Sequence, residues 1–292
     1  MNQEKNIETE TPKEEKSFFG IIVHSFFIIP FLIAVFCVLL FTAIHLLTRE
    51  NRSVYDYLED VKTGGLTKRW QGAFELSKIL ANPKLIPDDT RFVNELIAAF
   101  EHSAHDDPRV RQYLAFAMGR TEKKEFTETL INSLDDEKEE TVAASIYALG
   151  MLKDSRAIAR LEPFLESQNS RIRSITVTAL GTIADETSLP LLRKALLDTE
   201  PNVQWGAAIS LAGMKDLSGK EILLNLLNRE YLSQFPEVDP NEQNQLILFT
   251  IDSIGLLYDD DIFKAIKILS TTDTNMKVRA RALDAINNKE KS

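Results

Sequence analysis

A repeat of 31 residues constrains this chain more than any other feature. With Val110 as position zero, equivalent positions fall at Thr141, Ile172 and Val203, each 31 residues after the last. Position eight of each unit is apolar and position seven is small: the pairs are Ala117 and Met118, Ala148 and Leu149, Ala179 and Leu180, Ser210 and Leu211. Positions 0, 4, 7 and 8 share one face of a helix, so each unit is expected to open with an amphipathic helix.

Glycine and aspartate mark the middle of each unit. Position nine holds Gly119, Gly150 and Gly181, with Ala212 in the fourth unit. Glycine here is expected either to end the helix in a left-handed conformation or to let a neighbouring backbone pass closely. Position thirteen holds Asp154, Asp185 and Asp216, and aspartate is a good N-cap. The pattern predicts that one helix stops and another starts.

Paired leucines define the second helix of each unit. Positions 20 and 24 hold Leu130 and Leu134, Leu161 and Leu165, Leu192 and Leu196, Leu223 and Leu227. Leucines four residues apart lie on one helical face. A single helix pair cannot bury its apolar stripes alone, so consecutive pairs are expected to stack into a continuous core.

The repeat extends in both directions once insertions are allowed. Leu246 and Val278 open two later units, and "RWQGAFEL" from Arg69 opens an earlier one. The first and last units are imperfect, as capping repeats commonly are. The predicted fold class is therefore all-α: an α-solenoid of about seven helix pairs over residues 66–292.

The N-terminal region has a different composition. Residues 1–17 are polar and lack apolar periodicity, so they are expected to form a disordered tail. Residues 18–47 contain no Asp, Glu, Lys or Arg, and this length is ample for a helix across a bilayer core of about 30 Å. We expect a transmembrane helix; a cleaved signal peptide is the alternative, but its apolar region would be about 7–15 residues long. Residues 48–65 are expected to form a juxtamembrane linker or helix.

Pro30 and the flanking charges refine this interpretation. Pro30 either kinks the span or separates an interfacial segment from it. Three lysines precede the span, and five basic residues follow it closely: Arg49, Arg52, Lys62, Lys68 and Arg69. We expect a bacterial inner membrane protein with a single span. The positive-inside bias favours the orientation in which its solenoid lies in the cytoplasm. The alternative places the solenoid on the other side.

Three segments, "DPRVRQYLAFAMG", "NSRIRSITVTALG" and "NMKVRARALDAIN", resemble the HEAT-like repeats of phycobilin lyases. The resemblance implies the solenoid fold and says little about function. Deoxyhypusine hydroxylases have similar repeats and hold two irons with His-Glu dipeptides, but this sequence contains no such dipeptide. HEAT-like DNA glycosylases use a basic concave face, whereas residues 49–292 carry 31 basic and 39 acidic side chains. Nucleic acid is therefore not an expected partner.

Few residues suggest site chemistry. "EHSAHDD", residues 101–107, offers His102, His105 and Asp106 as metal ligands, but acidic residues before a helix have an ordinary electrostatic role. Position one holds Arg111, Arg173 and Arg279. These arginines either pair with carboxylates in a ladder along the stack or form an anion-binding stripe, and we prefer the ladder. Cys37 is the single cysteine. No catalytic, cofactor-binding or metal-binding residue is predicted.

The two places where the distance between equivalent positions departs from 31 residues are more informative about function. The step from Val203 to Leu246 is 43 residues, and the inserted segment carries Tyr231 and Phe235. Trp205 occupies position two, which is small or polar elsewhere; it is either covered by this insertion or an interface anchor. A 41-residue step from Arg69 to Val110 inserts "ANPKLIPDDT" near Trp70. Trp205, Tyr231, Phe235 and Trp70 are thus the candidate protein-interaction residues.

These features together predict a membrane-anchored HEAT-repeat scaffold or adaptor. Its expected partners are proteins of a membrane-associated complex, held by a few aromatic or Arg anchors on a rigid curved stack. The alternative is a membrane-tethered enzyme of a HEAT-like family, either related to bilin lyases or metal-dependent.

Overall fold

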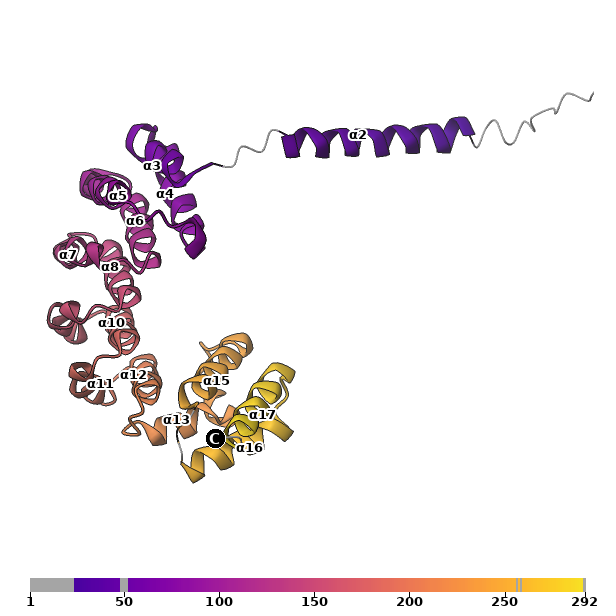
Figure 1. The fold of residues 1–292 in the computed structure, drawn as a ribbon. Coiled ribbons are helices and arrows are strands. Elements are labelled where there is room, and N and C mark those ends of the chain that lie inside the picture. The colour runs from indigo at the N-terminus through magenta and orange to yellow at the C-terminus, as the bar shows by residue number, and fades with distance from the viewer. Residues whose placement is uncertain (1–23, 48–51, 256, 258, 291–292) are drawn as a thin grey trace, which may run out of the picture. The chain divides into compact units, whose positions relative to one another are not determined.

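The structure is a computed structural model that describes residues 24–47, 52–255, 257 and 259–290. The predicted polar tail, the first residues of the predicted span (18–23) and residues 48–51 lie outside the described residues. The chain divides into two compact units, Met1–Arg52 and Ser53–Ser292. All regular structure in the described residues is helical, as the sequence predicts (Figure 1).

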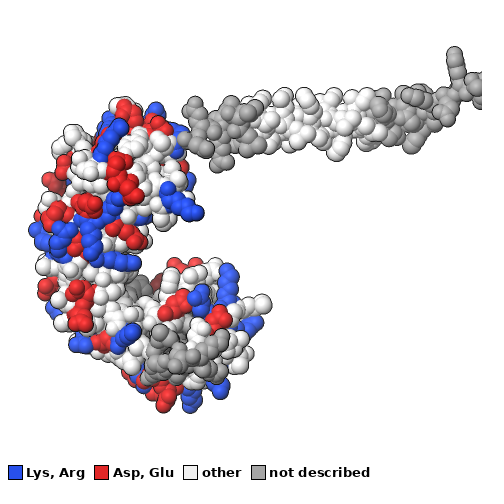
Figure 2. Space-filling view, viewed as in Figure 1, with Lys and Arg blue, Asp and Glu red and all other residues white. Residues whose placement is uncertain are grey.

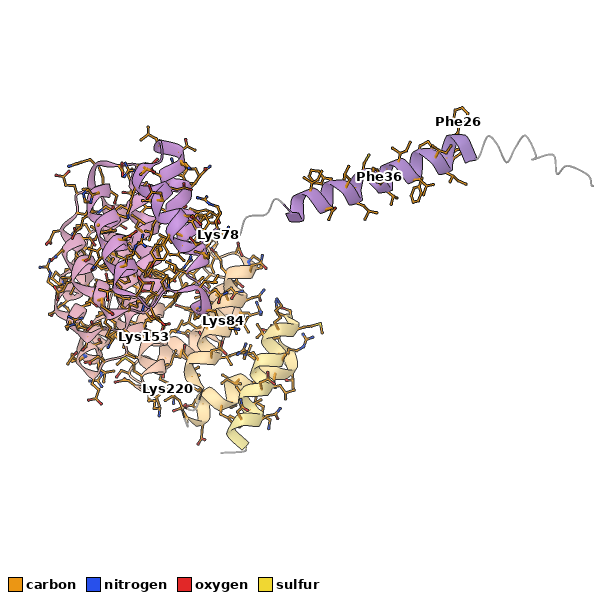
Figure 3. The ribbon with its side chains drawn as sticks, turned by 45° about the horizontal axis from the view of Figure 1, so that its top comes forward. Phe26, Phe36, Lys78, Lys84, Lys153 and Lys220 are labelled. Atoms are coloured by element: carbon orange, nitrogen blue, oxygen red, sulfur yellow. The ribbon has the colours of Figure 1, made fainter. Side chains whose placement is uncertain are left out.

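The first unit contains a π-helical turn, η1 (His24–Ile28), followed by α2 (Ile29–Leu47). Pro30 is the second residue of α2, directly after the π-helical turn, so it lies where the helical segment changes from π to α geometry. Apolar side chains such as Phe26 and Phe36 project outward from this segment (Figure 3). Residues Phe26–Ile44 have a mean hydropathy of 2.9, and the helix is long and apolar enough to cross a bilayer.

The second unit is a solenoid with two rows of helices (Figure 1). The first helices of the repeats form an inner row along the hollow of the curve. The inner row comprises α4 (Leu66–Ile79), α6 (Pro108–Arg120), α8 (Glu139–Leu152), α10 (Ser170–Ile183), α12 (Pro201–Gly213), α15 (Pro240–Ile254) and α17 (Met276–Glu290).

The second helices form the outer row and are generally shorter. They comprise α5 (Thr90–His102), α7 (Thr127–Asn132), α9 (Ile158–Leu161) with η7 (Glu162–Glu166), α11 (Leu189–Ala195), α13 (Lys220–Leu226) and α16 (Asp260–Thr272). Short 3₁₀ turns lead into or out of several of them: η2 (Pro83–Leu85), η3 (Ser103–His105), η4 (Lys124–Phe126), η5 (Ser133–Asp135), η6 (Ser155–Ala157) and η8 (Glu186–Ser188). The paired rows confirm the predicted solenoid of about seven units.

Each end of the solenoid is completed by a single helix. At the start, α3 (Val54–Thr63) packs against α4 and α5 and buries Val54, Leu58 and Val61. Ser53 caps it with a reciprocal capping box. The solenoid therefore begins at Ser53, earlier than the predicted residue 66, because residues 54–63 carry their own apolar stripe. At the other end, α17 has no outer-row partner among the described residues.

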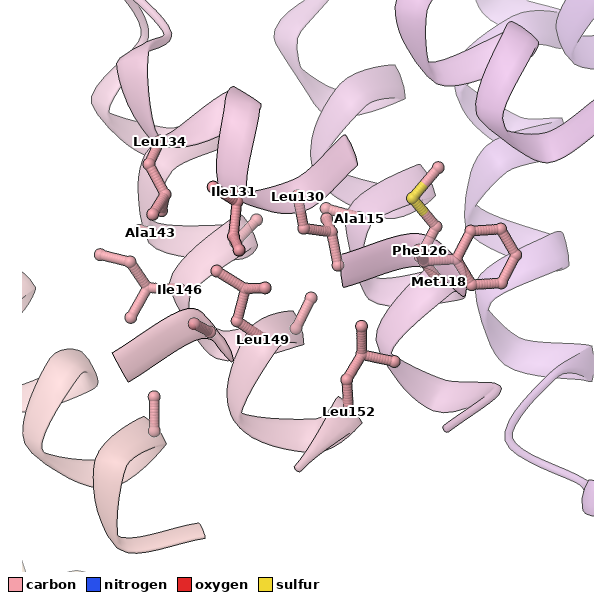
Figure 4. Packing of buried hydrophobic residues seen from close by; sticks show 14 of the residues in the cluster. Ala115, Met118, Phe126, Leu130, Ile131, Leu134, Ala143, Ile146, Leu149 and Leu152 are labelled. Atoms are coloured by element: carbon pink, nitrogen blue, oxygen red, sulfur yellow. The ribbon is translucent and has the colours of Figure 1, made fainter. Parts of the chain in front are cut away.

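The core runs between the rows, as the leucine spacing predicts. Leu130, Ile131 and Leu134 of the α7 region face Ala143, Ile146 and Leu149 of α8 (Figure 4). Buried residues form one cluster from Val54 to Leu211 and a second from Trp205 to Ala282. Helix α12 contributes to both, so it joins the regular units to the C-terminal ones.

The repeated glycines lie inside the inner helices and do not end them. A Cβ on Gly119 would stand 2.8 Å from the Cα of Ala148, so close backbone approach is their role. The left-handed residues come three positions later, at Glu122, Lys153, Ala184 and Lys215, with φ between 50° and 62°. At Gly119, Gly150 and Gly181 the alternative that placed the left-handed helix end at glycine was wrong. Gly255, at position nine of the unit that Leu246 opens, does end its helix, with a φ of 35°.

The predicted aspartate caps are present at Asp154 and Asp185. Asp154 accepts a hydrogen bond from the Arg156 amide at the start of η6, and Asp185 accepts one from the Thr187 amide at the start of η8. Each satisfies an amide that the new helical turn leaves without a partner. Asp216 accepts a hydrogen bond from the Ser218 amide but does not cap α13, because the N-cap of that helix is Gly219.

Candidate functional site

Trp205 is covered by the insertion that follows α13. Its side chain is 2% exposed, and its indole N–H donates to the Tyr231 hydroxyl at 3.3 Å. The Phe235 ring packs edge-on at 4.9 Å between centroids. The insertion contains α14 (Arg229–Leu232), with Leu232 fully buried. Trp205 was expected to be either covered by the insertion or exposed as an interface anchor, and the structure shows it covered. The Trp205 ring is therefore not available to a partner.

Trp70 lies at the other irregular step and remains partly accessible. It packs against the core from α4, and the Arg109 guanidinium sits 4.5 Å from its ring centroid. Arg109 also donates to the Asp107 carboxylate at 2.9 Å, which holds the pKa of that carboxyl below its usual value. Trp70 is therefore fixed in place at the N-terminal part of the inner row.

A row of four aromatic side chains crosses three inner helices beside Trp70. Phe74 of α4 contacts Tyr113 of α6 at 5.1 Å between ring centroids. Tyr113 then meets Phe116 at 6.4 Å, and Phe116 meets Tyr147 of α8 at 5.7 Å. All three contacts are edge-on, the geometry that aromatic quadrupoles prefer. We call Phe74, Tyr113, Phe116 and Tyr147 the aromatic row.

The aromatic row is accessible from the hollow side of the solenoid. Tyr147 is 47% exposed, and Phe74, Tyr113 and Phe116 are partly buried. Tyr113 occupies repeat position three, while Phe116 and Tyr147 occupy position six. These positions lie on the helix face turned away from the outer row, since positions 0, 4, 7 and 8 face the core.

Over the next helices this face is uncharged at positions three, six and ten, but position minus one, at the start of the same stripe, holds Glu140 in α8 and Arg171 in α10. Positions three, six and ten of α8, α10 and α12 hold Ala144, Tyr147, Met151, Ile175, Thr178, Thr182, Gly206, Ile209 and Gly213. None of these nine described residues is charged. We call them the uncharged face. By contrast, charged side chains are spread over the outer row (Figure 2). Helix α11 of that row, for example, carries Arg193 and Lys194 in its last turn.

Two of the three position-one arginines, Arg111 and Arg173, form the expected ladder with carboxylates, whereas Arg279 donates to the backbone carbonyl of Asp273. Arg111 pairs with Asp136 at 3.0 Å, and Arg173 binds both oxygens of Asp198 at 2.7 and 2.8 Å. This pairing lowers the pKa of Asp198. Each pair connects one unit to the loop that starts the next, so these residues serve stacking.

Three residues of "EHSAHDD", namely His102, Asp106 and Asp107, likewise have partners within the fold, whereas His105 is exposed. Asp106 pairs with Arg69, Asp107 caps α6, and His102 Nδ1 lies 2.6 Å from the Ala98 carbonyl oxygen. The described residues contain no group of three or more His, Cys, Asp or Glu side chains placed to hold a metal ion.

Comparison with known proteins identifies the repeat. Residues 93–176 and 163–233 match the family model for HEAT repeats. Residues 93–233 of the chain are therefore HEAT repeats. No curated protein matches its sequence.

Solved structures share the fold of this HEAT-repeat protein. The complex of CpcE and CpcF of phycocyanin lyase from Nostoc sp. PCC7120 is similar, with 19% identity and a TM-score of 0.56 over 83% of this chain and 96% of that one. An archaeal HEAT-like repeats protein from Thermococcus onnurineus NA1 has 16% identity and a TM-score of 0.45 over 83% and 99% of the two chains. At these identities, the first likeness establishes the fold alone.

The aromatic row was missed by sequence reasoning that concentrated on the irregular steps. A signal was present, because Tyr113, Phe116 and Tyr147 are aromatic at positions that do not face the core. Phe74 lacked even this signal, since the 41-residue step breaks the register of the first unit. Only the packed structure brings Phe74 next to Tyr113.

Proposed function

We propose that this HEAT-repeat protein is a membrane-anchored scaffold that binds a partner protein along its inner helix row. The solenoid fold supports a binding function, because stacked repeats present a long, rigid, concave surface. The apolar helix α2 supports the anchor, since its length and composition suit a bilayer core.

The aromatic row is the observation that carries the proposal. Large aromatic side chains supply much of the energy of protein interfaces, and they do so best when little entropy is lost on binding. The four rings already brace one another across α4, α6 and α8. They are therefore ordered before a partner arrives, and Tyr147 extends furthest into solvent.

The proposal places the solenoid in the cytoplasm and assigns it no catalysis. The cytoplasmic location is inferred from the basic residues next to the apolar segment: five follow it closely and three precede it. The absence of a catalytic role is supported by the use of Asp106, Asp107, Arg111 and Arg173 in stacking contacts. The partner we expect is a protein of a membrane complex.

Site-specific photocrosslinking tests the binding face. The full-length chain carries benzoylphenylalanine at Tyr147, and the matched control carries it at Glu221, which is exposed on α13 of the outer row. We expect a crosslink to a protein in the membrane fraction from position 147, and none from 221. Phe74→Ala should weaken that crosslink while leaving the thermal unfolding midpoint close to wild type. Equal crosslinking from both positions, or none from 147, contradicts the proposal.

Anchoring and side are tested separately. The chain should remain in membranes after alkaline carbonate extraction, and deletion of residues 18–47 should release it. A reporter fused after Ser292 that is active only in the cytoplasm should give signal. Activity of a reporter that works only outside the cytoplasm would instead place the solenoid on the opposite side.

A further inference from the structure

Helix α17 carries two apolar stripes, and the fold covers only one of them. Val278 and Ala282 are fully buried against the rest of the solenoid. Met276, Ala280 and Leu283 are exposed on the opposite side, at the i, i+4, i+7 spacing of a single helical face. Met276 is 75% exposed and Leu283 is 51% exposed. A surface helix usually has one apolar face, so the second stripe points to a further contact.

This exposed stripe coincides with the face that the preceding inner helices use for stacking. Counted from Val278, Leu283 is position five. The equivalent residues of α6, α8, α10, α12 and α15 are no more than 1% exposed: Ala115, Ile146, Val177, Ala208 and Ile251.

Position nine, one turn further along the same face, holds the glycines that lie against the next inner helix in the regular units. In α17 the face is again apolar, but no further described helix stacks on it (Figure 1). The stripe of Met276, Ala280 and Leu283 therefore continues the interface that holds the units together.

The opposite end of the solenoid presents charge instead. Helix α3 covers α4 and α5 with its apolar side and exposes Asp56, Glu59 and Lys62. Within α3, all of which is described, no large hydrophobic side chain is exposed. Stacking the α17 stripe on this end would bury those charges, so head-to-tail growth is disfavoured. Two copies that meet through the same stripe form a closed pair and need no other complementary surface.

The charges beside the stripe favour a second copy in the antiparallel direction. Lys277 and Asp284 are seven residues apart on one flank of the stripe, and neither forms an ion pair among the described residues. In two antiparallel helices packed through this stripe, Lys277 of one copy lies beside Asp284 of the other, twice by symmetry. Ala280 then faces Leu283, so a small side chain meets a large one. In parallel helices the two opposite charges would be separated by roughly 10 Å along the axis.

We infer that the chain forms a two-fold dimer through α17, in which Met276, Ala280 and Leu283 pack antiparallel against the same residues of a second copy. Three apolar side chains per copy make a small contact, so the dimer is expected to be weak in dilute solution. The proposed anchor would confine both copies to one membrane and raise their effective concentration. The aromatic row lies on α4, α6 and α8, outside this contact, so each copy keeps its own partner-binding face.

Photocrosslinking between two tagged copies tests the inference. Full-length chains with two different tags are produced in the same cells, and one of them carries benzoylphenylalanine, first at Leu283 and then at Met276. We expect a product that contains both tags, with the attachment within residues 276–287 of the second copy. The matched control carries the probe at Leu197, which is also apolar and is 85% exposed just after α11, and should give no such product.

A charge inside the stripe should prevent the contact. Ala280→Glu places a carboxylate opposite Leu283 of the second copy, where it would lose its hydration without a counter-ion. We expect at least a tenfold loss of the two-tag product, equivalent to about 1.4 kcal/mol. The unfolding midpoint should stay at the wild-type value, because Ala280 is exposed in the single chain.

Charge exchange tests the direction of packing. Lys277→Glu and Asp284→Lys should each lower the yield several-fold, since each places like charges side by side at both symmetric contacts. The double variant reverses both pairs and should restore the yield. A purely structural role of either residue within one chain predicts no such restoration.

The inference is overturned if neither probe yields a product with both tags, or if the attached peptide comes from another protein or from outside residues 276–287. It is also overturned if Ala280→Glu leaves the yield unchanged. Failure of the double variant to restore the yield overturns the antiparallel arrangement. A crosslink from Tyr147 to a partner protein is unaffected by each of these outcomes, so the proposed function is judged separately.

Discussion

Gly150 of α8 lies against Ala179 of α10 so closely that a Cβ on the glycine would stand 2.8 Å from the alanine Cα. The same relationship joins Gly119 to Ala148 one unit earlier. The distance between successive inner helices is therefore set by a missing side chain on one helix and a small one on the next. This spacing fixes how the units stack.

We predict that Gly150→Ala destabilises the solenoid. The new methyl group must displace the α10 backbone, and overpacking of this kind costs about 1–3 kcal/mol, more than the gain of up to about 1 kcal/mol in helix propensity. Gly213→Ala is the matched control, since its methyl enters open space, and it should stabilise by about 0.5–1 kcal/mol. Chemical denaturation of both variants measures the difference. Equal shifts of the same sign would refute this account of the spacing.

The repeat arithmetic predicted the helix pairs because burial at positions 0, 4, 7 and 8 is a local property of each helix. It could not decide between the two roles of Gly150, since both put glycine near a helix end. The left-handed residues Lys153 and Ala184 carried no signal at all, because neither is a residue type that favours this conformation. They adopt it as the C-caps of α8 and α10, where their backbone N–H groups donate to the carbonyls of Gly150 and Leu180.

Removal of one partner of the Arg173–Asp198 pair should destabilise the solenoid strongly. Both side chains are 12% exposed, and Arg173 also donates to the Ser167 carbonyl at 2.8 Å. Asp198→Asn leaves a poorly paired guanidinium, so we expect a loss of about 2–4 kcal/mol, near the range for broken buried pairs. Thermal or chemical unfolding reports this directly.

An exposed pair in the same region provides the comparison. Lys194 and Glu166 are 2.7 Å apart but 70% and 68% exposed. Glu166→Gln should change the unfolding free energy by less than about 1 kcal/mol, because water screens such pairs. A loss as large as that of Asp198→Asn would show that burial does not control these contacts.

Acid should weaken the solenoid through Asp154. Hydrogen bonds from the Arg156 side chain, and then from the Thr127 hydroxyl at 2.8 Å, lower the pKa of Asp154 from 3.8 to about 2. Because the folded pKa lies below the unfolded one, the stabilisation is complete above about pH 4 and is lost as the pH falls toward 2. We expect about 2 kcal/mol of pH-dependent stability from this group.

Asp154→Asn isolates that contribution. Unfolding free energies of the two proteins, measured from pH 5 to the lowest pH at which both remain folded, should converge as the pH falls. Other aspartates with lowered pKa values, such as Asp198, remain in both proteins and cancel in the comparison. A constant difference at every pH would rule out Asp154 as a source of the acid sensitivity.

The buried aromatic cluster under the 229–245 insertion should contribute to stability. Trp205→Ala removes a fully buried ring and should cost about 3–5 kcal/mol. A double-mutant cycle of Trp205→Leu and Phe235→Leu should give a coupling of about 0.5–1.5 kcal/mol for the edge-on contact. Leu197→Ala is the control, because Leu197 is 85% exposed and should shift stability by less than about 0.5 kcal/mol. Additive effects of the two ring substitutions would show that the insertion does not cover Trp205 in solution.

Sequence reasoning found Trp205, Tyr231 and Phe235 as a group but could not decide whether they face a partner or one another. Both outcomes place aromatic residues beside a broken repeat, and only the path of the inserted chain separates them. The aromatic row was hidden for the opposite reason. Tyr113, Phe116 and Tyr147 lie in ordinary units, and their proximity to one another and to Phe74 depends on the angle at which consecutive inner helices pack.

The last prediction concerns where the solenoid begins. Helix α3 covers α4 and α5 with Val54, Leu58 and Val61, so a protein of residues 53–292 should unfold as cooperatively as the full chain freed of its apolar segment. A protein of residues 66–292 loses that cover and should have a lower unfolding midpoint and bind a hydrophobic dye. Leu58→Ala in the 53–292 protein should cost about 2–5 kcal/mol, since the side chain is fully buried. If the two shortened proteins were equally stable, α3 would be a linker and not part of the solenoid, because its burial would contribute no free energy of folding.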